Sequence, residues 1–315
     1  MRLKRMEGLT MQNSQQTQQS KHYSAYATLL DGFQSYLDAE KTYYKYFTSE
    51  NPSMTVDEWC DKMYTDLINK INRVPFTSEA ADRGTAFNEL VDAFIKKPLA
   101  KRLEENDMES EHITFRVVTL NIKGRRKTDP VVQREAYEVV FDPKKKEREE
   151  ALANHKEGEE MPEVQEPQTF TYFKDVTDEF VDYYEGALPQ VFVFGTLDTH
   201  FGKIDLYGYA DELLPFACHD IKTTKNYHAG NFREHWQHIV YPYCLHCMGM
   251  EINHFEYNVT NFKETFTETY VFDEARDVPR LRDVCEHFIQ FLEHNRDVIT
   301  DTKVFNSLNS RNQNE

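Results

Sequence analysis

The sequence has no long apolar run, few cysteines and no excess of basic residues. No segment approaches the stretch of about 18 apolar residues that a membrane helix requires, so we expect no membrane span. No apolar segment follows the basic N-terminus, which argues against a signal peptide. Five cysteines, an odd number, fit a reducing compartment, and we expect a cytoplasmic protein. Phosphate-binding glycine loops and the His-Glu-x-x-His zinc motif are also absent.

Basic residues are outnumbered: 37 Lys and Arg stand against 54 Asp and Glu in 315 residues, a net charge of −17. This charge excludes general coating of nucleic acid, because that mode of binding needs a basic surface. It is compatible with an enzyme that holds DNA in a local basic groove and reaches the phosphate through a metal ion. The hydrophobic share of 39% predicts a folded chain with a substantial core.

The hydrophobic pattern predicts one domain of α/β (α+β) class, a short mixed sheet flanked by helices. Residues 1–20 are polar and rich in Gln and Ser, which predicts a disordered tail. Apolar residues recur every three or four positions from His22 to about Glu105, a helical period, and one of these helices covers about residues 79–97. Within a domain over 21–300, we assign 21–77 to N-terminal helices, 106–170 to an insertion, 171–300 to the main core with a C-terminal helix, and 301–315 to a tail.

The insertion has the alternating pattern of a β-hairpin. Residues 113–119 and 137–141 alternate between apolar and polar side chains, and the basic segment Lys123–Lys127 lies between them. Residues 144–166 are mostly charged, and we favour a mobile linker over a solvated helix there.

The main core begins with a helix over residues 176–184 and three strands, over 191–195, 204–209 and 217–223. If Pro215 and Phe216 form a turn, Asp211 lies opposite Asp220 on an antiparallel pair. Cβ atoms of such a pair are about 4.5–5.5 Å apart, where two carboxylates repel unless a cation lies between them. Oxygen ligands on a partly hydrated site suit Mg²⁺.

Lys222 completes this candidate site. Asp220 and Lys222 are two residues apart and share one face of a strand, whereas Ile221 points to the opposite face and into a core. A lysine beside a metal ion can orient or deprotonate a water, so these groups suit metal-dependent hydrolysis of a phosphodiester. An isolated Asp/Lys pair is more often a solvated strand face, and the surrounding residues decide between the two interpretations.

A helix after the third strand supplies two further polar residues. Asn231, with Glu234 three residues later, resembles a capping box and predicts a helix from there to about Met250. Gln237 and Tyr241 lie one turn apart on this helix and share a face. They could hold the phosphate backbone or the attacking water. Strands over 255–260 and 267–272 and an amphipathic helix through 281–292 follow.

Three segments in this order resemble the motifs of the PD-(D/E)XK nuclease superfamily, most of all its RecB-like branch, which includes phage-type exonucleases. The segments are Gly208-Tyr209-Ala210-Asp211, Asp220-Ile221-Lys222 and Gln237-His238-Ile239-Val240-Tyr241. The resemblance covers about residues 78–260 and implies a restriction-endonuclease-like core. It also implies that Asp211, Asp220 and the Ile221 carbonyl hold Mg²⁺ or Mn²⁺, while Lys222 activates or positions the attacking water.

The resemblance further implies that Gln237 and Tyr241 support the active site and the DNA strand, and we add Lys225 as a candidate DNA contact. The family's first motif lies on an earlier helix, where the matching segment is Arg83–Glu89. Asn88 stands where RecB-like members carry a metal-binding His. We slightly favour the next residue, Glu89, as the third metal ligand, because a carboxylate compensates the charge of the metal better than an amide does.

Some RecB-like nucleases carry an iron–sulfur cluster on four cysteines. This sequence has the required number of cysteines, but their spacing differs from that of the cluster ligands; they are Cys60, Cys244, Cys247 and Cys285. Because Cys244 and Cys247 lie on a helix that we expect to be buried, we expect no cluster. The leading hypothesis is a Mg²⁺-dependent exonuclease that acts on DNA in recombination, repair or phage DNA processing, with a single-strand annealing or recombination protein as a possible partner. The alternatives are a structure-selective endonuclease and a non-catalytic DNA- or protein-binding module.

Overall fold

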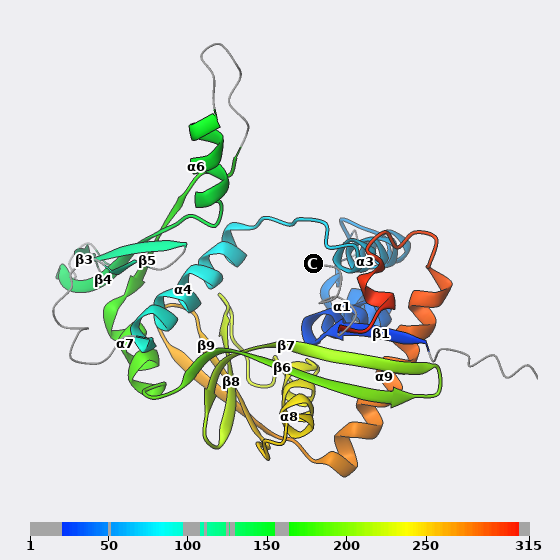
Figure 1. Ribbon diagram of the computed structural model, residues 1–315. Helices are drawn as coiled ribbons and strands as arrows, with labels where there is room; N and C mark the ends of the chain where they lie inside the picture. Colours follow the sequence, from blue (N-terminus) through cyan, green and yellow to red (C-terminus); the bar gives the residue numbers. More distant parts are fainter. Residues whose placement is uncertain are drawn as a thin grey trace, which may run out of the picture.

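The computed structural model describes residues 21–49, 52–96, 108–109, 112–123, 126, 130–154 and 164–308. It has mixed α/β architecture, with a large mixed sheet, a smaller antiparallel sheet and helices packed on both (Figure 1). The predicted tail over 1–20 and most of the basic tip at 123–127 lie outside the described residues. None of the described helices combines the length and the apolar character of a membrane span.

The large sheet is organised around one long strand, β7 (Gly202–Leu214). β6 (Leu188–Thr199) pairs antiparallel with β7 along most of its length. On the other edge of β7, β1 (His22–Tyr26) pairs in parallel with its first half and β8 (Ala217–Thr223) antiparallel with its end. β9 (His254–Thr260) then runs parallel to β8, and β10 (Thr265–Val271) antiparallel to β9.

Strand β1 corrects the prediction of a helical pattern from His22 onward. Tyr23 and Ala25 are buried and the strand hydrogen-bonds to β7, so tertiary pairing decides its conformation. The helices expected after it are present as α1 (Ala27–Leu37), α2 (Ala39–Tyr46) and α3 (Val56–Ile71). α3 begins at a capping box formed by Thr55 and Glu58.

The insertion forms the smaller sheet. The predicted hairpin is confirmed as β3 (Ile113–Ile122) and β4 (Val132–Phe141), flanked by β2 (Met108–Glu109) and by an unpredicted strand, β5 (Gln168–Phe173). The preference for a linker after residue 144 was wrong at its start, because Lys145–Asn154 form the exposed helix α6. Residues 155–163 of that segment lie outside the described part of the chain.

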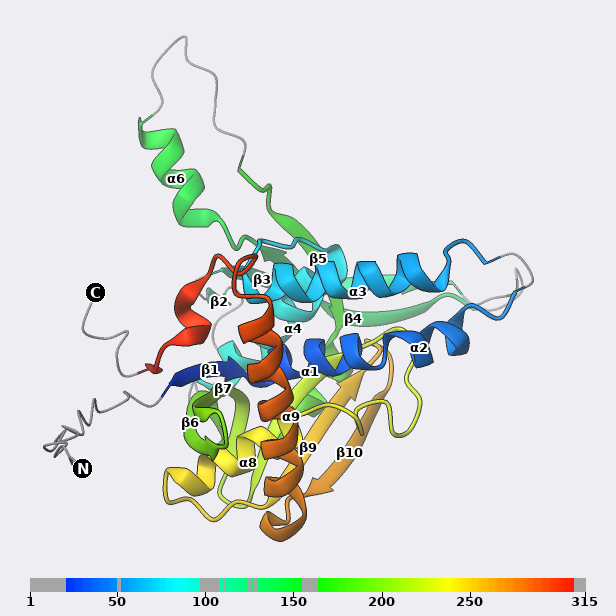
Figure 2. The ribbon, with the colours of Figure 1, turned by 90° about the vertical axis from the view of Figure 1, so that its right-hand side faces the viewer.

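Two hydrophobic cores hold these parts together. The larger one lies between the large sheet and the helices α1, α3, α8 (Gln237–Cys247) and α9 (Glu274–His294) (Figure 2). The smaller one joins α4 (Glu79–Ile95) and α7 (Lys174–Tyr183) to the small sheet and includes Ile221 of β8. β8 therefore contributes to both cores through its two faces.

Two further boundaries differ from the prediction. α8 begins at Gln237 and not near Asn231, because the backbone N–H groups of Gly230 and Asn231 bond to Glu268 and the N–H of Trp236 bonds to Asp31. Residues 301–308, assigned to a polar tail, instead pack beside β1. They include the short 3₁₀ helix Thr302–Phe305 and the buried Val304.

Candidate active site

The hairpin that carries the candidate carboxylates has the predicted turn. Glu212 pairs with His219, Leu213 with Cys218 and Leu214 with Ala217, as counted from the sequence. The ladder ends there, so Asp211 and Asp220 do not form the expected cross-strand pair. Instead, the Ile221 N–H donates a hydrogen bond of 2.8 Å to Oδ2 of Asp211.

Asp211 also lies at an interruption of the other ladder. β6 pairs Pro189 with Glu212 and Val191 with Ala210, and Gln190 between them has a φ of 53°. This conformation is uncommon for a residue other than glycine, and it marks a break in the ladder that leaves the register on either side unchanged. Asp211 is thus released from regular pairing on both edges of β7, and its side chain bonds to the backbone of β8.

Asp220 and Lys222 share one face of β8, as predicted, and Ile221 is buried on the other. The Lys222 Nζ lies 2.6 Å from Oδ2 of Asp220. The amide of Gln237, at the start of α8, donates to Oδ1 of Asp220 at 2.5 Å. Three elements, β7, β8 and α8, therefore bring predicted site residues into contact.

Tyr241 is held in the same group by a close approach of α8 to β7. Its hydroxyl lies 3.4 Å from the Gln237 amide nitrogen. A Cβ at Gly208 would lie only 2.6 Å from Cε1 of the Tyr241 ring, so the glycine makes room for the tyrosine. Gly208 and Tyr241 belong to different motifs of the sequence, and this contact gives a physical reason for their occurring together.

The charges of the site are coupled. Burial and the neighbouring Asp220 carboxylate raise the pKa of Asp211 to about 8, and the Lys222 ammonium offsets part of the rise. Burial lowers the pKa of Lys222, but Asp220 and Asp211 outweigh it and hold this pKa above its usual range. Lys222 is therefore a firmly protonated cation between two acidic groups.

The structure distinguishes the two candidates for a third ligand on α4. The amide nitrogen of Asn88 lies 3.4 Å from Oδ2 of Asp211, whereas Glu89 pairs with Nδ1 of His112 at 2.8 Å. The helix register therefore places Asn88 beside Asp211 and turns Glu89 toward the insertion, and the metal-binding role of either residue stays a prediction. α4 reaches the site closely: a Cβ at Gly84 would lie 2.8 Å from the Thr223 hydroxyl at the end of β8.

A buried pair of carboxyl groups next to the site was not predicted. Glu212, adjacent to Asp211, is fully buried, and Asp92, one helical turn after Asn88, is 4% exposed. Burial and the nearby Asp92 raise the pKa of Glu212 to about 9. The sequence signal was an aspartate within the otherwise apolar segment Leu90–Ile95 of α4, a position where a charged residue needs a polar partner.

The remaining predicted residues lie outside this group. Lys225 is exposed in the segment after β8. Cys60 lies on α3, while Cys244 and Cys285 are buried on α8 and α9; Cys247 is exposed, contrary to expectation. Within the described part of the chain, no three His, Cys, Asp or Glu side chains form a metal-binding group.

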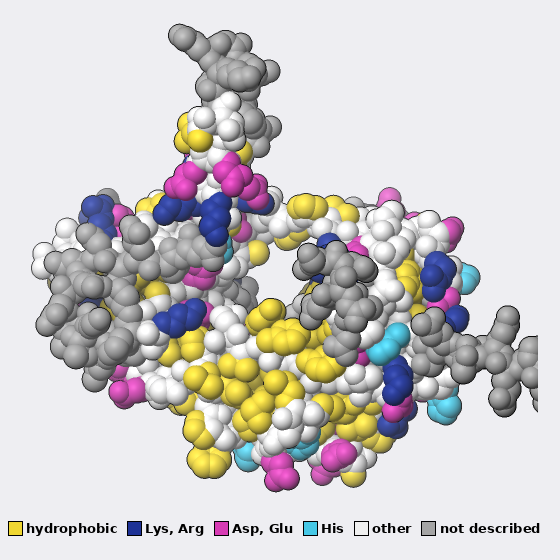
Figure 3. Space-filling model, in the orientation of Figure 1, with side chains coloured by type: hydrophobic (Ala, Val, Ile, Leu, Met, Phe, Trp, Pro, Cys, Tyr) yellow, Lys and Arg dark blue, Asp and Glu magenta, His cyan; other side chains and the backbone are white. Residues whose placement is uncertain are grey.

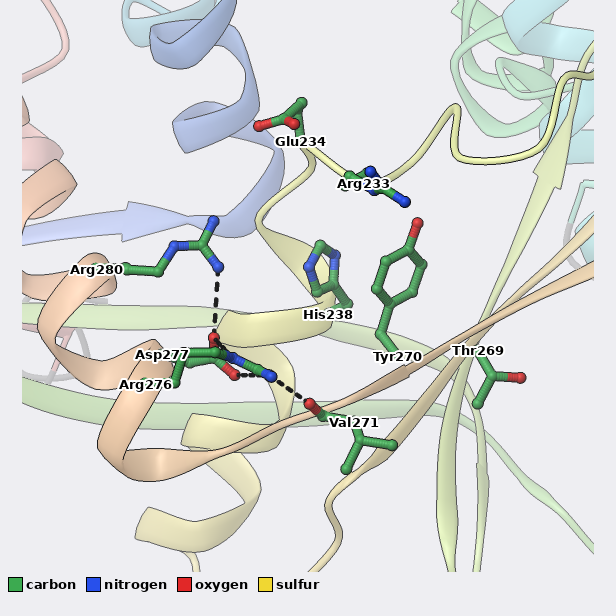
Figure 4. A pocket seen from close by; sticks show the side chains of 9 residues that line it. All are labelled: Arg233, Glu234, His238, Thr269, Tyr270, Val271, Arg276, Asp277 and Arg280. Carbon is green, nitrogen blue, oxygen red and sulfur yellow. Dashed lines mark hydrogen bonds and ion pairs between the residues drawn. The ribbon is translucent and has the colours of Figure 1, made fainter.

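A separate pocket of about 420 Å³ is lined by residues from α8, β10, α9 and the segment before α8 (Figure 4). His238, the residue after Gln237, stacks on Tyr270 in its wall, with ring centroids 4.2 Å apart. Arg276 donates hydrogen bonds to the buried carboxylate of Asp277, and Arg280 also contacts it. Acidic and basic groups alternate here, so the pocket presents no strong excess of either charge.

Comparisons with known proteins add little to this picture. No family model and no curated protein matches the chain. One solved structure is similar in part, the crystal structure of SSO0001, with 13% identity over 36% of this chain and 54% of that one and a TM-score of 0.28. The chain thus spans about half the length of that protein, and a likeness this weak carries no argument.

Proposed function

We propose that the protein is a metal-dependent DNA nuclease, acting as an exonuclease on linear DNA. The observation that carries the proposal is the convergence of Asp211, Asp220, Lys222 and Gln237 from three elements, with Asn88 beside Asp211. Such a set of buried carboxylates, a half-buried amine and amides suits phosphodiester hydrolysis better than it suits a structural role, because the burial of charged groups is costly.

The order of elements supports a restriction-endonuclease-like core. A helix (α4) precedes an antiparallel meander (β6, β7, β8), which is followed by a helix (α8) and by a strand (β9) parallel to the third strand of the meander. The candidate residues lie on the second strand, the third strand and the helix that follows. This is the placement that the resemblance of the three motifs implies.

The residues present fit a hard divalent cation. Asp211 and Asp220 supply carboxylate oxygens, and the Ile221 carbonyl lies between Asp220 and Lys222. In addition, Oδ1 of Asn88 and Oε1 of Gln237 are buried oxygens that accept no hydrogen bond from the described residues. Oxygen-only donors of this kind are those that Mg²⁺ and Mn²⁺ prefer. When bound, the cation would lower the pKa of a water and stabilise charge developing on the phosphate.

The protein groups around this position have separable tasks. The Lys222 ammonium can donate hydrogen bonds to the attacking water or to a non-bridging phosphate oxygen. Gln237 fixes the rotamer of Asp220 through its 2.5 Å hydrogen bond, and Tyr241 fixes Gln237 in turn. Because Lys222 is held as a cation, its expected contribution is stabilisation of negative charge and not removal of a proton.

The test is cleavage of labelled linear DNA by the purified protein with Mg²⁺ or Mn²⁺. We expect Lys222→Ala to reduce the rate at least about a hundredfold, as loss of a transition-state donor does. Lys41→Ala, which removes an exposed lysine on α2 that has no place in the candidate site, is the control and should retain most activity. If Lys222→Ala cleaves DNA as fast as the unmodified protein, the nuclease assignment is wrong. If the unmodified protein cleaves circular DNA as fast as linear DNA, the enzyme is an endonuclease and not an exonuclease.

Asn88 motivates the alternative of a non-catalytic binding module. A neutral amide at the position next to Asp211 weakens the expected hold on a cation relative to a third carboxylate. Calorimetry of Mn²⁺ binding distinguishes the two functions. A nuclease should bind Mn²⁺, and Asp211→Asn should abolish that binding. No uptake by the unmodified protein would favour the module.

A further inference from the structure

Five aromatic side chains gather on one side of the large sheet, and we call this surface the aromatic face. It consists of Tyr26 from β1, Phe192 and Phe194 from β6, and Tyr207 and Tyr209 from β7. On β7 these residues alternate with the buried Leu206 and Gly208, which face α8. The aromatic face therefore lies on the side of the sheet opposite α8.

The rings of the aromatic face follow one another across the strands. Ring centroids are 6.0 Å apart for Tyr26 and Tyr207, 6.4 Å for Tyr207 and Phe192, and 5.2 Å for Phe192 and Tyr209. Phe192 is 43% exposed and Tyr209 56%. Tyr209, the most exposed of these rings, precedes Asp211 by only two residues on β7.

The chain passes over this side of the sheet. The segment 72–78 joins α3 to α4 and contains Arg73, whose guanidinium bonds to the Tyr207 hydroxyl at 3.1 Å and to Asp301 at 2.8 Å. Figure 3 shows an opening beneath this segment, with hydrophobic side chains along its lower rim. The aromatic face thus forms part of a surface enclosed by the chain.

The chemistry of this surface suits bases better than phosphates. The whole chain carries a net charge of −17, and extensive contacts to a phosphate backbone need the opposite sign. Stacking of a base on an aromatic ring requires no charge and accepts every base. In a duplex the base faces are covered by their neighbours, so only an unpaired strand offers them.

We propose that the aromatic face binds single-stranded DNA by base stacking and guides the strand to Asp211 and Asp220. The inference rests on the proposed nuclease function and adds the form of DNA that reaches the site. It assigns Phe192 and Tyr209, which have no other evident reason to be exposed, the role of positioning residues for the strand.

The test is a binding experiment in which fluorescence anisotropy reports the binding of fluorescein-labelled oligothymidylate to the full chain. EDTA is present so that no cleavage occurs. We expect Tyr209→Leu and Phe192→Leu to weaken binding about tenfold each, because Leu keeps apolar area and loses the π-face. Tyr209→Phe should bind like the unmodified protein. Phe201→Leu is the control, since Phe201 is also 43% exposed but lies at the far turn between β6 and β7.

Salt dependence gives a second readout. Binding that depends on stacking should change little with salt, with a slope of log K against log[salt] of magnitude below about 2, or about three phosphate contacts. A steep slope, tighter binding of duplex DNA or of oligouridylate, or a dimer that Phe192→Leu dissociates would each overturn the proposal.

The two proposals fail in different ways. If Lys222→Ala abolishes cleavage while Tyr209→Leu and Phe192→Leu leave binding and cleavage of single strands unchanged, the aromatic face proposal is wrong and the nuclease stands. If the protein cuts no DNA but Tyr209→Leu still weakens binding of oligothymidylate, the nuclease is wrong and the stacking surface stands.

Discussion

At the scale of the residue, His238 shows how burial changes a side chain that the motif resemblance left without a role. It lies between the catalytic candidate Gln237 and the pocket of Figure 4, is 7% exposed and stacks on Tyr270. Burial lowers its pKa to about 4, against the opposing influence of Asp277. The folded protein therefore keeps this imidazole neutral at pH values where the unfolded chain protonates it.

This shift predicts a pH dependence of stability. Between pH 6.5 and 4 only the unfolded chain binds the proton, so the free energy of unfolding falls as the pH is lowered. In His238→Phe, which keeps an aromatic ring against Tyr270, that component is absent. We therefore expect the free energy of unfolding to fall by about 2 kcal/mol less in the variant than in the unmodified protein when the pH is lowered from 7 to 5. Urea unfolding at the two pH values measures this difference. Parallel losses in both proteins would show that His238 does not titrate in this way.

At the scale of the element, α8 carries Gln237 and Tyr241, and a residue distant in sequence determines where it begins. The Trp236 N–H donates to Oδ1 of Asp31 on α1 at 2.6 Å. The local pattern pointed to Asn231 instead, but the N–H of Asn231 bonds to Glu268 on β10. The chain from Gly230 to Glu234 forms turns between these two tertiary anchors.

A substitution at Asp31 tests this anchor. Asp31→Ala leaves the Trp236 N–H without its acceptor and should lower the free energy of unfolding by about 1–2 kcal/mol. Asn231→Ala, the change that a local cap would make costly, should cost less than about 0.5 kcal/mol. Urea unfolding of both variants provides the comparison, and a larger loss for Asn231→Ala would restore the local cap.

The elements show which features could be predicted from sequence. The hairpin around Pro215 and the helices with a clear apolar period follow from short-range patterns, and most lie where they were expected. The conformations of β1, β5 and the start of α8 depend on partners far away in the chain. The periodicity of apolar residues within a segment carries no information about such partners. In the site, the convergence of Asp220, Lys222 and Gln237 was predictable. The choice between Asn88 and Glu89 was not, because one residue of helix register decides it.

At the scale of the whole molecule, two segments that are far apart in the sequence, β1 and residues 301–308, meet beside β7. The hydroxyl of Ser24 on β1 donates to the Lys303 carbonyl at 2.9 Å. The buried carboxylate of Asp205 on β7 accepts hydrogen bonds from Ser307 and from the Leu308 N–H. Residues 301–308 therefore belong to the fold that supports the candidate site.

Removal of apolar contact at this junction should affect global stability. Val304 is 3% exposed, and Val304→Ala should lower the free energy of unfolding by about 2 kcal/mol, from lost transfer energy and a residual cavity. Thr302→Ala, at an exposed position two residues earlier, is the control and should be neutral. Both are measured by urea unfolding, and equal values for the two variants would mean that this segment is not packed.

The parallel pairing of β1 with β7 has a consequence for synthesis on the ribosome. Tyr23 is made well before its strand partner Ile204, which lies about 180 residues later in the sequence. The segment 301–308, which completes the surroundings of Asp205, emerges later still. Contacts this distant in sequence form slowly, because loop closure must precede them. A nascent chain therefore lacks the fully supported strand that carries Asp211 until residues 301–308 have been made.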